Sequence, residues 1–326
     1  MTRRLLALAV IAACGNAPTP LFDGDVAPNV ITVDGVAYWT TTEPDGLEAL
    51  WSMELATGEA VQIATDDLGS EPGRHGIAAA DGVVYWSHGL RTGSPEFTFV
   101  VRGEPGHVEL ARTPGSIFPF DMFVDGDAQI ACDGGRLLRI ARDGTAATEL
   151  ALVTTELGFG QLGRELIATR TFLAESCACD RLEVVAIDVD TAAVRSIAKL
   201  DHPRTSIAID PITRTGFGLD PFGKLSRFDL SIDNGVVEAS ATASERGSFY
   251  RLVFTHGALY GVTQDDSSFD NVYPESHLVR ISETGDVDVI ADGLGYTKLA
   301  IDGDTFVIAS LHREDTPGFI ATVPIE

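Results

Sequence analysis

The sequence predicts an all-β fold, and three observations lead to that prediction. Short apolar runs alternate with turns that contain glycine or aspartate along the 326 residues, which is the pattern of strands joined by hairpins. This pattern recurs at intervals of roughly 40 residues, a period typical of repeat architectures. No segment has helical periodicity over a length that would predict a competing helical fold.

The repeat is clearest at Val33–Thr40 and Ala80–Ser87, which read VDGVAYWT and ADGVVYWS. Asp-Gly between two apolar runs predicts a hairpin, because glycine adopts the positive φ that a tight turn requires. We align seven units on this first turn. The turns are Asp34-Gly35, Asp81-Gly82, Asp125-Gly126, Gly163-Arg164, Asp210–Thr213, His256-Gly257 and Asp302-Gly303.

Each unit continues into a third and a fourth strand around a second glycine turn. This part is clearest at Met53–Gly58, Leu137–Gly144 and Leu278–Gly285. Four antiparallel strands in roughly 40 to 45 residues make one blade of a β-propeller. We therefore predict a single β-propeller of seven four-stranded blades, with six or eight blades as alternatives, because stacked blades bury both faces of each sheet.

The last unit, Thr297–Glu326, is long enough for about three strands. We expect the N-terminal segment to supply the missing strand and close the ring, with Leu21–Val26 as the donor. This gives three regions: a signal peptide at 1–14, a linker or closing strand at 15–28, and the propeller at 29–326. Seven units leave no room for a second domain.

Two blades carry an aromatic pair at the end of the second strand. Tyr38-Trp39-Thr40 and Tyr85-Trp86-Ser87 resemble the YWTD-type propeller repeats of extracellular receptors, and so do third strands with the pattern Leu-x-Arg-Ile-x-x-x-Gly. The resemblance implies fold rather than function, since Thr41 and His88 stand where those repeats carry aspartate. We expect the aromatic pairs to pack between blades.

The N-terminus has the features of an export signal. Arg3 and Arg4 precede the apolar run Leu5–Ala13, which is too short to span a bilayer. The segment Ile11–Asn16, with Cys14 after two alanines, resembles the lipobox of bacterial lipoproteins. That resemblance implies lipidation of Cys14 and a location in the cell envelope. If the source is Gram-negative, it implies the outer membrane, because Gly15 is not Asp. A plain signal peptide is the alternative.

Composition excludes some partners. The chain has 23 basic and 48 acidic side chains and a net charge of −25. Such a surface repels nucleic acids and anionic headgroups. We expect no nucleic-acid binding, and contact with the membrane through the lipid anchor alone.

Three cysteines follow Cys14: Cys132, Cys177 and Cys179. Cys177 and Cys179 are too close in sequence for a relaxed disulfide between them, so Cys132 paired with one of the two is the disulfide we favour in an oxidising compartment. Two thiolates could also hold a soft metal, although no nearby histidine completes a zinc set. Metal and cofactor therefore stay unknown.

Candidate ligand-binding residues come from loops that meet at one mouth of the central channel. These loops precede the first strand of a blade or follow its second strand, and such a face is where propellers bind ligands. Several basic residues and histidines fall there in a chain with few cations. They are Arg74, His75, His88, Arg204, Arg246, Lys298 and His312.

Two functions fit this pattern. A binding or scaffolding module at the envelope is the first, with a small-molecule ligand or an envelope protein as partner. The alternative is a metal-assisted lyase or hydrolase at the channel mouth, similar in architecture to seven-bladed bacterial lyases that use histidine and a divalent metal. No catalytic residue is assigned, since polar residues are common in loops and no catalytic motif occurs.

Overall fold

The structure is a computed structural model that describes most of the chain. The described residues are 17–42, 48–66, 76–81, 83–89, 95–101, 107–112, 122–125, 128–133, 136–141, 147–152, 159–173, 180–200, 206–219, 223–235, 237–242, 248–264, 275–311 and 317–325. They contain strands and turns and no helix, which confirms the all-β prediction. Within these ranges, therefore, there is no helix long and apolar enough to span a membrane.

The described strands form seven sheets of four strands each. The first two sheets are β2 (Val26–Val33), β3 (Val36–Thr42), β4 (Glu48–Glu54) and β5 (Glu59–Asp66), then β6 (Ile77–Ala80), β7 (Val83–Gly89), β8 (Pro95–Val101) and β9 (His107–Arg112). The next two are β10 (Met122–Asp125), β11 (Ala128–Asp133), β12 (Arg136–Ala141) and β13 (Ala147–Leu152), then β14 (Phe159–Leu162), β15 (Glu165–Leu173), β16 (Asp180–Asp188) and β17 (Val194–Leu200).

The remaining three sheets complete the series. The fifth and sixth are β18 (Ser206–Asp210), β19 (Thr215–Leu219), β20 (Lys224–Asp229) and β21 (Glu238–Thr242), then β22 (Ser248–Thr255), β23 (Ala258–Gln264), β24 (Ser276–Ile281) and β25 (Val287–Leu294). The last sheet joins both ends of the chain: β26 (Thr297–Asp302), β27 (Thr305–Ser310), β28 (Gly318–Pro324) and β1 (Pro20–Gly24).

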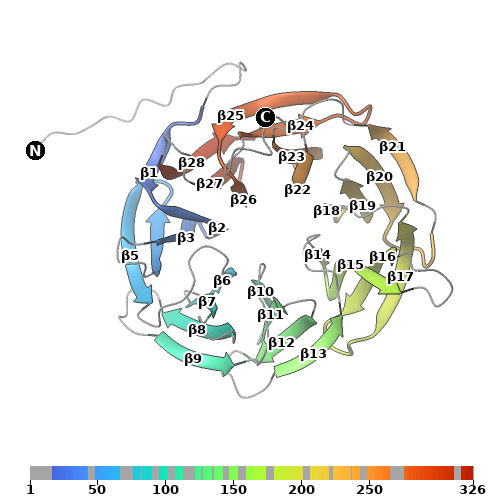
Figure 1. The fold of residues 1–326 in the computed structure, drawn as a ribbon, viewed down its shortest axis with the longest axis horizontal. Coiled ribbons are helices and arrows are strands. Elements are labelled where there is room, and N and C mark those ends of the chain that lie inside the picture. Colours follow the sequence, from blue (N-terminus) through green and yellow to red (C-terminus); the bar gives the residue numbers. More distant parts are fainter. Residues whose placement is uncertain are drawn as a thin grey trace, which may run out of the picture.

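The sheets are arranged side by side around a central axis (Figure 1). In each sheet the first strand lies nearest the axis and the fourth lies at the rim, as β2 and β5 show (Figure 1). Neighbouring inner strands lie against one another, β2 against both β26 and β6. The inner strands therefore line the centre of the molecule.

The first hairpin of a sheet turns as the sequence predicts. Asp34 and Gly35 have φ of 51° and 76°, and His256 and Gly257 have φ of 51° and 72°. A turn with two successive residues at positive φ matches the right-handed twist of the flanking strands. The residue before glycine must therefore tolerate the left-handed region of φ and ψ. The turn chemistry at these positions thus sets the register of β2 with β3 and of β22 with β23.

The aromatic pairs fill the space between sheets, which confirms the predicted packing role. Tyr38 and Trp86 are buried in one apolar cluster that joins the first and second sheets. Trp39 is fully buried on the other side of the first sheet, against Val307 and Ile320 of the last sheet. Large rings suit these positions because each sheet must bury both faces.

Both ends of the chain meet in the last sheet. Strand β1 pairs antiparallel with β28, with Phe22 opposite Ile320 and Gly24 opposite Gly318. The chain then enters β2 at Val26, within the 15–28 segment that the sequence predicted as linker or closing strand. β1 therefore belongs to the last sheet, and the strand that directly follows it belongs to the first.

We call the contact between the last and first sheets the aromatic junction, defined by Phe22, Trp39 and Trp51. The Phe22 ring lies 5.1 Å from Trp39 and 5.1 Å from Trp51, and the two indoles stack at 6.4 Å. Across the same junction, the Thr32 hydroxyl donates a hydrogen bond of 2.6 Å to the Ile301 carbonyl. Offset and edge contacts of this kind add to the burial of apolar area.

The contact between the fourth and fifth sheets differs, and we call it the polar junction, defined by Glu165, Arg195, Arg214 and Asp233. Arg195 Nε donates to Glu165 Oε1 at 2.7 Å and Arg195 Nη1 to Asp233 Oδ1 at 3.1 Å. Arg214 Nη2 donates to the same Glu165 at 3.3 Å. These charged groups lie over an apolar cluster that also joins the two sheets.

Backbone hydrogen bonds reinforce the polar junction. The Asn234 N–H donates to the Ser196 carbonyl at 2.9 Å, and the Gly235 N–H donates to the Ile197 carbonyl at 2.7 Å. The turn after β20 thereby pairs with β17, the outermost strand of the neighbouring sheet. Covering an edge strand in this way satisfies backbone groups that would otherwise face solvent or another chain.

Candidate functional site

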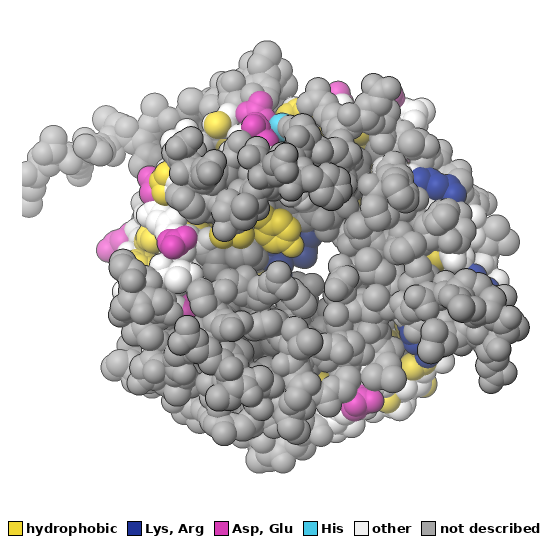
Figure 2. Space-filling model, in the orientation of Figure 1, with side chains coloured by type: hydrophobic (Ala, Val, Ile, Leu, Met, Phe, Trp, Pro, Cys, Tyr) yellow, Lys and Arg dark blue, Asp and Glu magenta, His cyan; other side chains and the backbone are white. Residues whose placement is uncertain are grey.

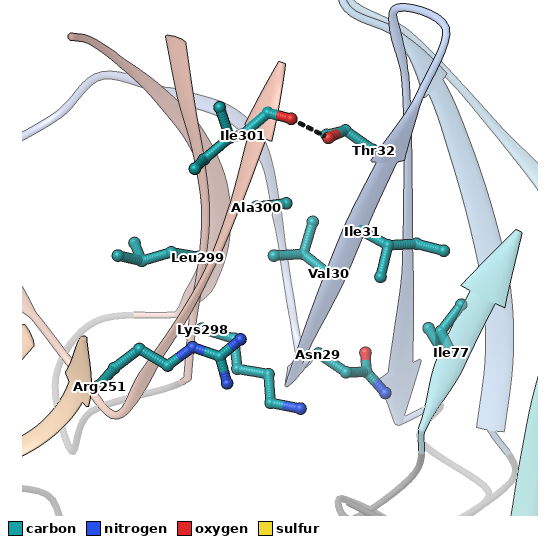
Figure 3. Close-up of a pocket in the computed structure, with 10 residues that line it drawn as sticks. All are labelled: Asn29, Val30, Ile31, Thr32, Ile77, Arg251, Lys298, Leu299, Ala300 and Ile301. Carbon is teal, nitrogen blue, oxygen red and sulfur yellow. Dashed lines mark hydrogen bonds between the residues drawn. The ribbon is translucent and has the colours of Figure 1, made fainter. Parts of the chain in front are cut away.

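A cavity of about 290 Å³ lies beside the central axis, between inner strands of four sheets. β2 and β26 form its walls, and β6 and β22 each contribute one residue (Figure 3). The lining residues are Asn29, Val30, Ile31, Thr32, Ile77, Arg251, Lys298, Leu299, Ala300 and Ile301. The ring arrangement thus brings together residues from both ends of the sequence.

One end of the cavity is cationic. The side chains of Arg251 and Lys298 extend next to each other at this end, with Asn29 on the opposite wall (Figure 3). In the space-filling view, basic and apolar side chains border the central opening (Figure 2). Two cations at one place are notable in a chain with 23 basic and 48 acidic residues.

Asn29 is held in one orientation by the first sheet. Its Oδ1 accepts hydrogen bonds of 3.1 Å from both the backbone N–H and the hydroxyl of Thr40. Asn29 is buried, with 3% of its surface exposed. These two hydrogen bonds fix the orientation of the Asn29 side-chain amide.

Irregular strand pairing places two of these polar residues. The register of β2 with β3 shifts between Val26 and Val30, and that of β22 with β23 shifts between Phe249 and Arg251. Asn29 lies within the first shift and Arg251 follows the second. Bulges bend a strand and redirect side chains, and they are frequent next to binding sites.

Apart from Thr32, the other lining residues carry apolar side chains. Val30, Ile77 and Leu299 are buried, and Ile31, Ala300 and Ile301 are partly buried. In the close-up view Val30 and Ala300 point into the space between β2 and β26, whereas Leu299 points away from β2 (Figure 3). The arrangement places two positive charges at one end of the cavity, which suits an anionic group.

Of the predicted site residues, one reaches this cavity. Lys298 was expected at the entry of the first strand of the last blade, and it lies in β26 with its side chain in the cavity. His88 lies in β7, and its side chain is outside the described part of the structure. The other predicted residues also lie outside the described ranges: Arg74, His75, Arg204, Arg246 and His312.

Sequence reasoning missed Arg251 and Asn29. The predicted residues come from loops at the ends of strands, whereas these two residues lie within the inner strands β22 and β2. A polar residue in an otherwise apolar inner strand was the available signal. The direction in which such a side chain points depends on strand bulges, and sequence periodicity does not reveal where bulges occur.

The cysteine and metal predictions fall largely outside the described residues. Cys14, Cys177 and Cys179 lie outside them, and Cys132 lies in β11 with an undescribed side chain. Within the described ranges, no group of three or more His, Cys, Asp and Glu residues is close enough to hold a metal ion. These residues therefore give no support to the metal-assisted alternative.

Within the described residues, the groups with shifted pKa values lie away from the cavity. Hydrogen bonding to Arg195 lowers the pKa of Glu165 at the polar junction, and hydrogen bonding to Thr213 lowers that of Asp210 in its turn. Each carboxylate stabilises a turn or a junction through donors that favour its charged form. They indicate structural roles rather than acid–base catalysis.

Comparison with known proteins identifies the fold. No protein-family model matches the chain, and no curated protein matches its sequence. A puromycin-hydrolysing peptidase from Mycobacterium tuberculosis aligns with a TM-score of 0.64 and 12% identity, over 96% of this chain and 55% of that one. The β-propeller domain of the trilobed protease from Pyrococcus furiosus aligns with a TM-score of 0.60 and 8% identity, over 93% and 94%. The chain has a β-propeller fold.

Two other solved structures align with somewhat lower TM-scores. The computationally designed Ika8 protein aligns with a TM-score of 0.55 and 9% identity, over 92% of this chain and 83% of that protein. The chain spans 55% of the peptidase and 42% of the tricorn protease, another of its structural matches. At 8 to 12% identity these similarities concern the fold alone, because propellers host unrelated functions.

Proposed function

We propose that this protein is an exported, lipid-anchored β-propeller that binds a small anionic ligand at the cell envelope. Its seven sheets would be the blades of one ring, closed by β1 on β28. A binding role agrees with the first function that the sequence suggested, and the cavity favours it over a purely scaffolding role toward an envelope protein.

The cavity is the single observation that carries the proposal. Arg251 comes from the sixth sheet and Lys298 from the last, and both side chains lie at one end of the same cavity. Charge-assisted hydrogen bonds from guanidinium and ammonium groups are among the stronger ones that proteins make to oxyanions. Because the chain has a net charge of −25, which repels anions, selective binding at this place would depend on these local donors.

Titration of the full chain with small anions tests the binding role. We expect acetate, aliphatic carboxylates or inorganic phosphate to give saturable heat in calorimetry at low salt. The double variant Arg251→Gln/Lys298→Gln should lower the affinity for every anion at least about tenfold, because each lost charge-assisted bond contributes about 1.5 to 3 kcal/mol.

The control variant removes two positive charges away from the cavity. Arg280 in β24 and Lys199 in β17 are exposed, and Arg280 belongs to the same sheet as Arg251. Arg280→Gln/Lys199→Gln should leave anion affinity nearly unchanged. Equal losses in the two double variants would mean that net charge, rather than the cavity, attracts the anion, and would reject the proposal.

The lipid anchor is supported by the N-terminal sequence, in which Cys14 follows the apolar run Leu5–Ala13. Labelling of cells with a radioactive or clickable fatty acid should mark the wild-type chain. Cys14→Ser should lose the label and move from the membrane fraction to the soluble exported fraction. Cys132→Ser should keep the label and stay in the membrane fraction. Label on the Cys14→Ser chain would contradict lipidation at this residue.

A further inference from the structure

We propose that the outer surface formed by β1 and the end of β25 faces the membrane, held there by the lipid on Cys14. This rests on the proposed function, because the lipid anchor is part of it. We call this surface the anchor rim, defined by Ala17–Gly24 and Asp292–Tyr296. Its partner is the headgroup layer of a bilayer that carries little negative charge.

The tether between the lipid and the folded chain is short. Ala17 is the first described residue, and it follows Cys14 by three positions. Three residues span at most about 11 Å even when fully extended. An acylated cysteine lies at the membrane surface with its acyl chains buried. Ala17 therefore stays within about 11 Å of that surface, whatever conformation the tether adopts.

From Ala17 onward the chain is attached to the propeller. The Ala17 side chain lies against Gly293 of β25, so close that a Cβ built on Gly293 would come within 3.4 Å of it. Pro20–Gly24 then pairs with β28, and the Phe22 ring packs in the aromatic junction. Because these contacts hold the segment on the sixth and last sheets, the short tether fixes the position of those sheets and not that of a loose terminus.

The propeller is larger than the reach of the tether. A folded chain of this length has a radius of gyration of about 20 Å. Gly293 lies near the end of the fourth strand β25, whereas Thr148 lies near the start of the fourth strand β13, across the central axis from β25 (Figure 1). Equivalent strands of a propeller run in the same direction. Thr148 therefore differs from Gly293 in its position both around the axis and along it, and it points away from the membrane.

The anchor rim suits a neutral headgroup layer. It contains no lysine or arginine, and its charged groups are Asp23 and Asp292. Nearby, Glu275 accepts a hydrogen bond of 3.2 Å from the Gly293 N–H. Anionic lipids would repel these carboxylates. Tyr296 is 42% exposed, and tyrosine is favoured at headgroup level because its ring has an apolar body and a polar end.

Fluorescence quenching on the lipidated full chain tests this orientation. A fluorescent amino acid would be placed at Thr19 or at Thr148, which are both exposed. Each protein would be reconstituted in phosphatidylcholine vesicles that carry a quencher on the headgroup. We expect quenching at Thr19 to exceed that at Thr148 at least about twofold, because the tether is shorter than the propeller. Adding phosphatidylglycerol should reduce quenching at Thr19, and high salt should reverse this reduction.

A longer tether should remove the difference between the two positions. Inserting about 20 Gly and Ser residues between Asn16 and Ala17 gives a flexible tether with an average end-to-end distance of about 25 Å. The propeller could then turn over, and quenching at Thr19 should fall toward that at Thr148. The control Asn16→Ser keeps the length of the tether and should keep the difference. Thermal unfolding of each variant would show that it is folded.

The outcomes separate this proposal from the proposed function. Equal quenching at Thr19 and Thr148 in a lipidated chain that stays on the vesicles would reject the orientation and leave the lipid anchor in place. If Cys14 acquires no lipid in cells, the anchor and the orientation are both wrong. If the difference survives the long tether, tether length does not orient the propeller, and the proposal is wrong in its cause.

Discussion

The aromatic junction and the polar junction join neighbouring sheets by different means. At the aromatic junction, Phe22, Trp39 and Trp51 pack where β1 pairs with β28. At the polar junction, Arg195 pairs with Asp233 and Arg214 pairs with Glu165 across the two sheets, beside a turn that pairs with β17. Both junctions also bury aliphatic side chains, each in its own cluster. The two junctions therefore differ in whether aromatic rings or charged groups are added to these aliphatic contacts.

The difference follows from the position of each junction in the chain. The fourth and fifth sheets are consecutive in sequence, so a fixed turn of one can pair with the outer strand of the other. The last and first sheets come from opposite ends of the chain, and their association closes a long loop at an entropic cost. We infer that burial of the three aromatic rings offsets this entropic cost. Ion pairs near the surface contribute too little to stability to do so.

The largest effect should come from Trp39→Ala, which removes the centre of the aromatic junction. Trp39 is fully buried, and truncation of a buried tryptophan lowers the free energy of unfolding by about 3–5 kcal/mol. Urea unfolding followed by circular dichroism would measure this loss. As a matched control, Val61→Ala in β5 of the same sheet should change stability by less than about 0.5 kcal/mol, since Val61 is 54% exposed.

This prediction also tests the comparison between the junctions. If Trp39→Ala costs no more than the removal of the Arg195–Glu165 pair, the two junctions do not differ in the way we infer. If Trp39→Ala lowers the free energy of unfolding by several kcal/mol and also reduces the slope of that free energy against denaturant concentration, the ring opens partly before global unfolding.

An intermediate effect should come from Gly318→Ala in β28. A Cβ at this position would lie 2.9 Å from the Gly24 carbonyl oxygen, 3.0 Å from the Ser310 carbonyl oxygen and 3.0 Å from the Val26 amide nitrogen. Backbone atoms cannot move aside as a side chain can, so we expect a loss of about 1–3 kcal/mol. Thr322→Ala on the same strand should cost less than about 1 kcal/mol.

Gly318→Ala also reports on the attachment of β1. Because two of the three close atoms, those of Gly24 and Val26, flank the connection between β1 and β2, the substitution should increase amide hydrogen exchange in Pro20–Gly24 more than in β14–β17. Equal exchange in both regions would mean that β1 is not the element displaced.

The smallest effect should come from Glu165→Gln at the polar junction, and it should depend on pH. Hydrogen bonding to Arg195 lowers the pKa of Glu165 below its ordinary value of 4.5. The carboxylate therefore stabilises the folded state above that value, and this contribution is lost as the pH falls through the lowered pKa of the folded state. At pH 7 we expect Glu165→Gln to cost about 1 kcal/mol, because the pair is only partly buried.

Denaturant unfolding at several pH values would measure the difference between wild type and Glu165→Gln. The difference should shrink below about pH 4.5 and weaken at high salt. Glu59→Gln, at an exposed position of β5, serves as the control and should give a small difference at all pH values. A difference for Glu165→Gln that persists unchanged at low pH would show that the charge of Glu165 is not what stabilises the junction.

Local patterns in the sequence predicted the elements of the fold. Asp34-Gly35 and His256-Gly257 predicted hairpins, and these residues adopt the required positive φ. The aromatic pair at Tyr38 and Trp39 predicted packing between sheets, and both residues are buried there. Such features are predictable because they depend on neighbours a few residues away and on the need of every sheet to bury its faces.

The candidate site was predicted less well. We expected loop residues at the channel mouth, and among them Lys298 lies in the cavity. Arg251 was overlooked in favour of Arg246, because the bulge in β22 that precedes Arg251 has no clear sequence signature. Asn29 was overlooked because its orientation depends on Thr40, which lies across the hairpin.

By itself, the sequence determined the all-β class, the strands, their first turns and the aromatic packing between sheets, since each depends on local periodicity and turn chemistry. The tertiary structure decided which distant residues meet. Asn29, Arg251 and Lys298 are far apart in the sequence, and they line one cavity because the last sheet lies next to the first. Two of the three are also directed by strand bulges, whose positions depend on how β2 and β22 fit against their partners.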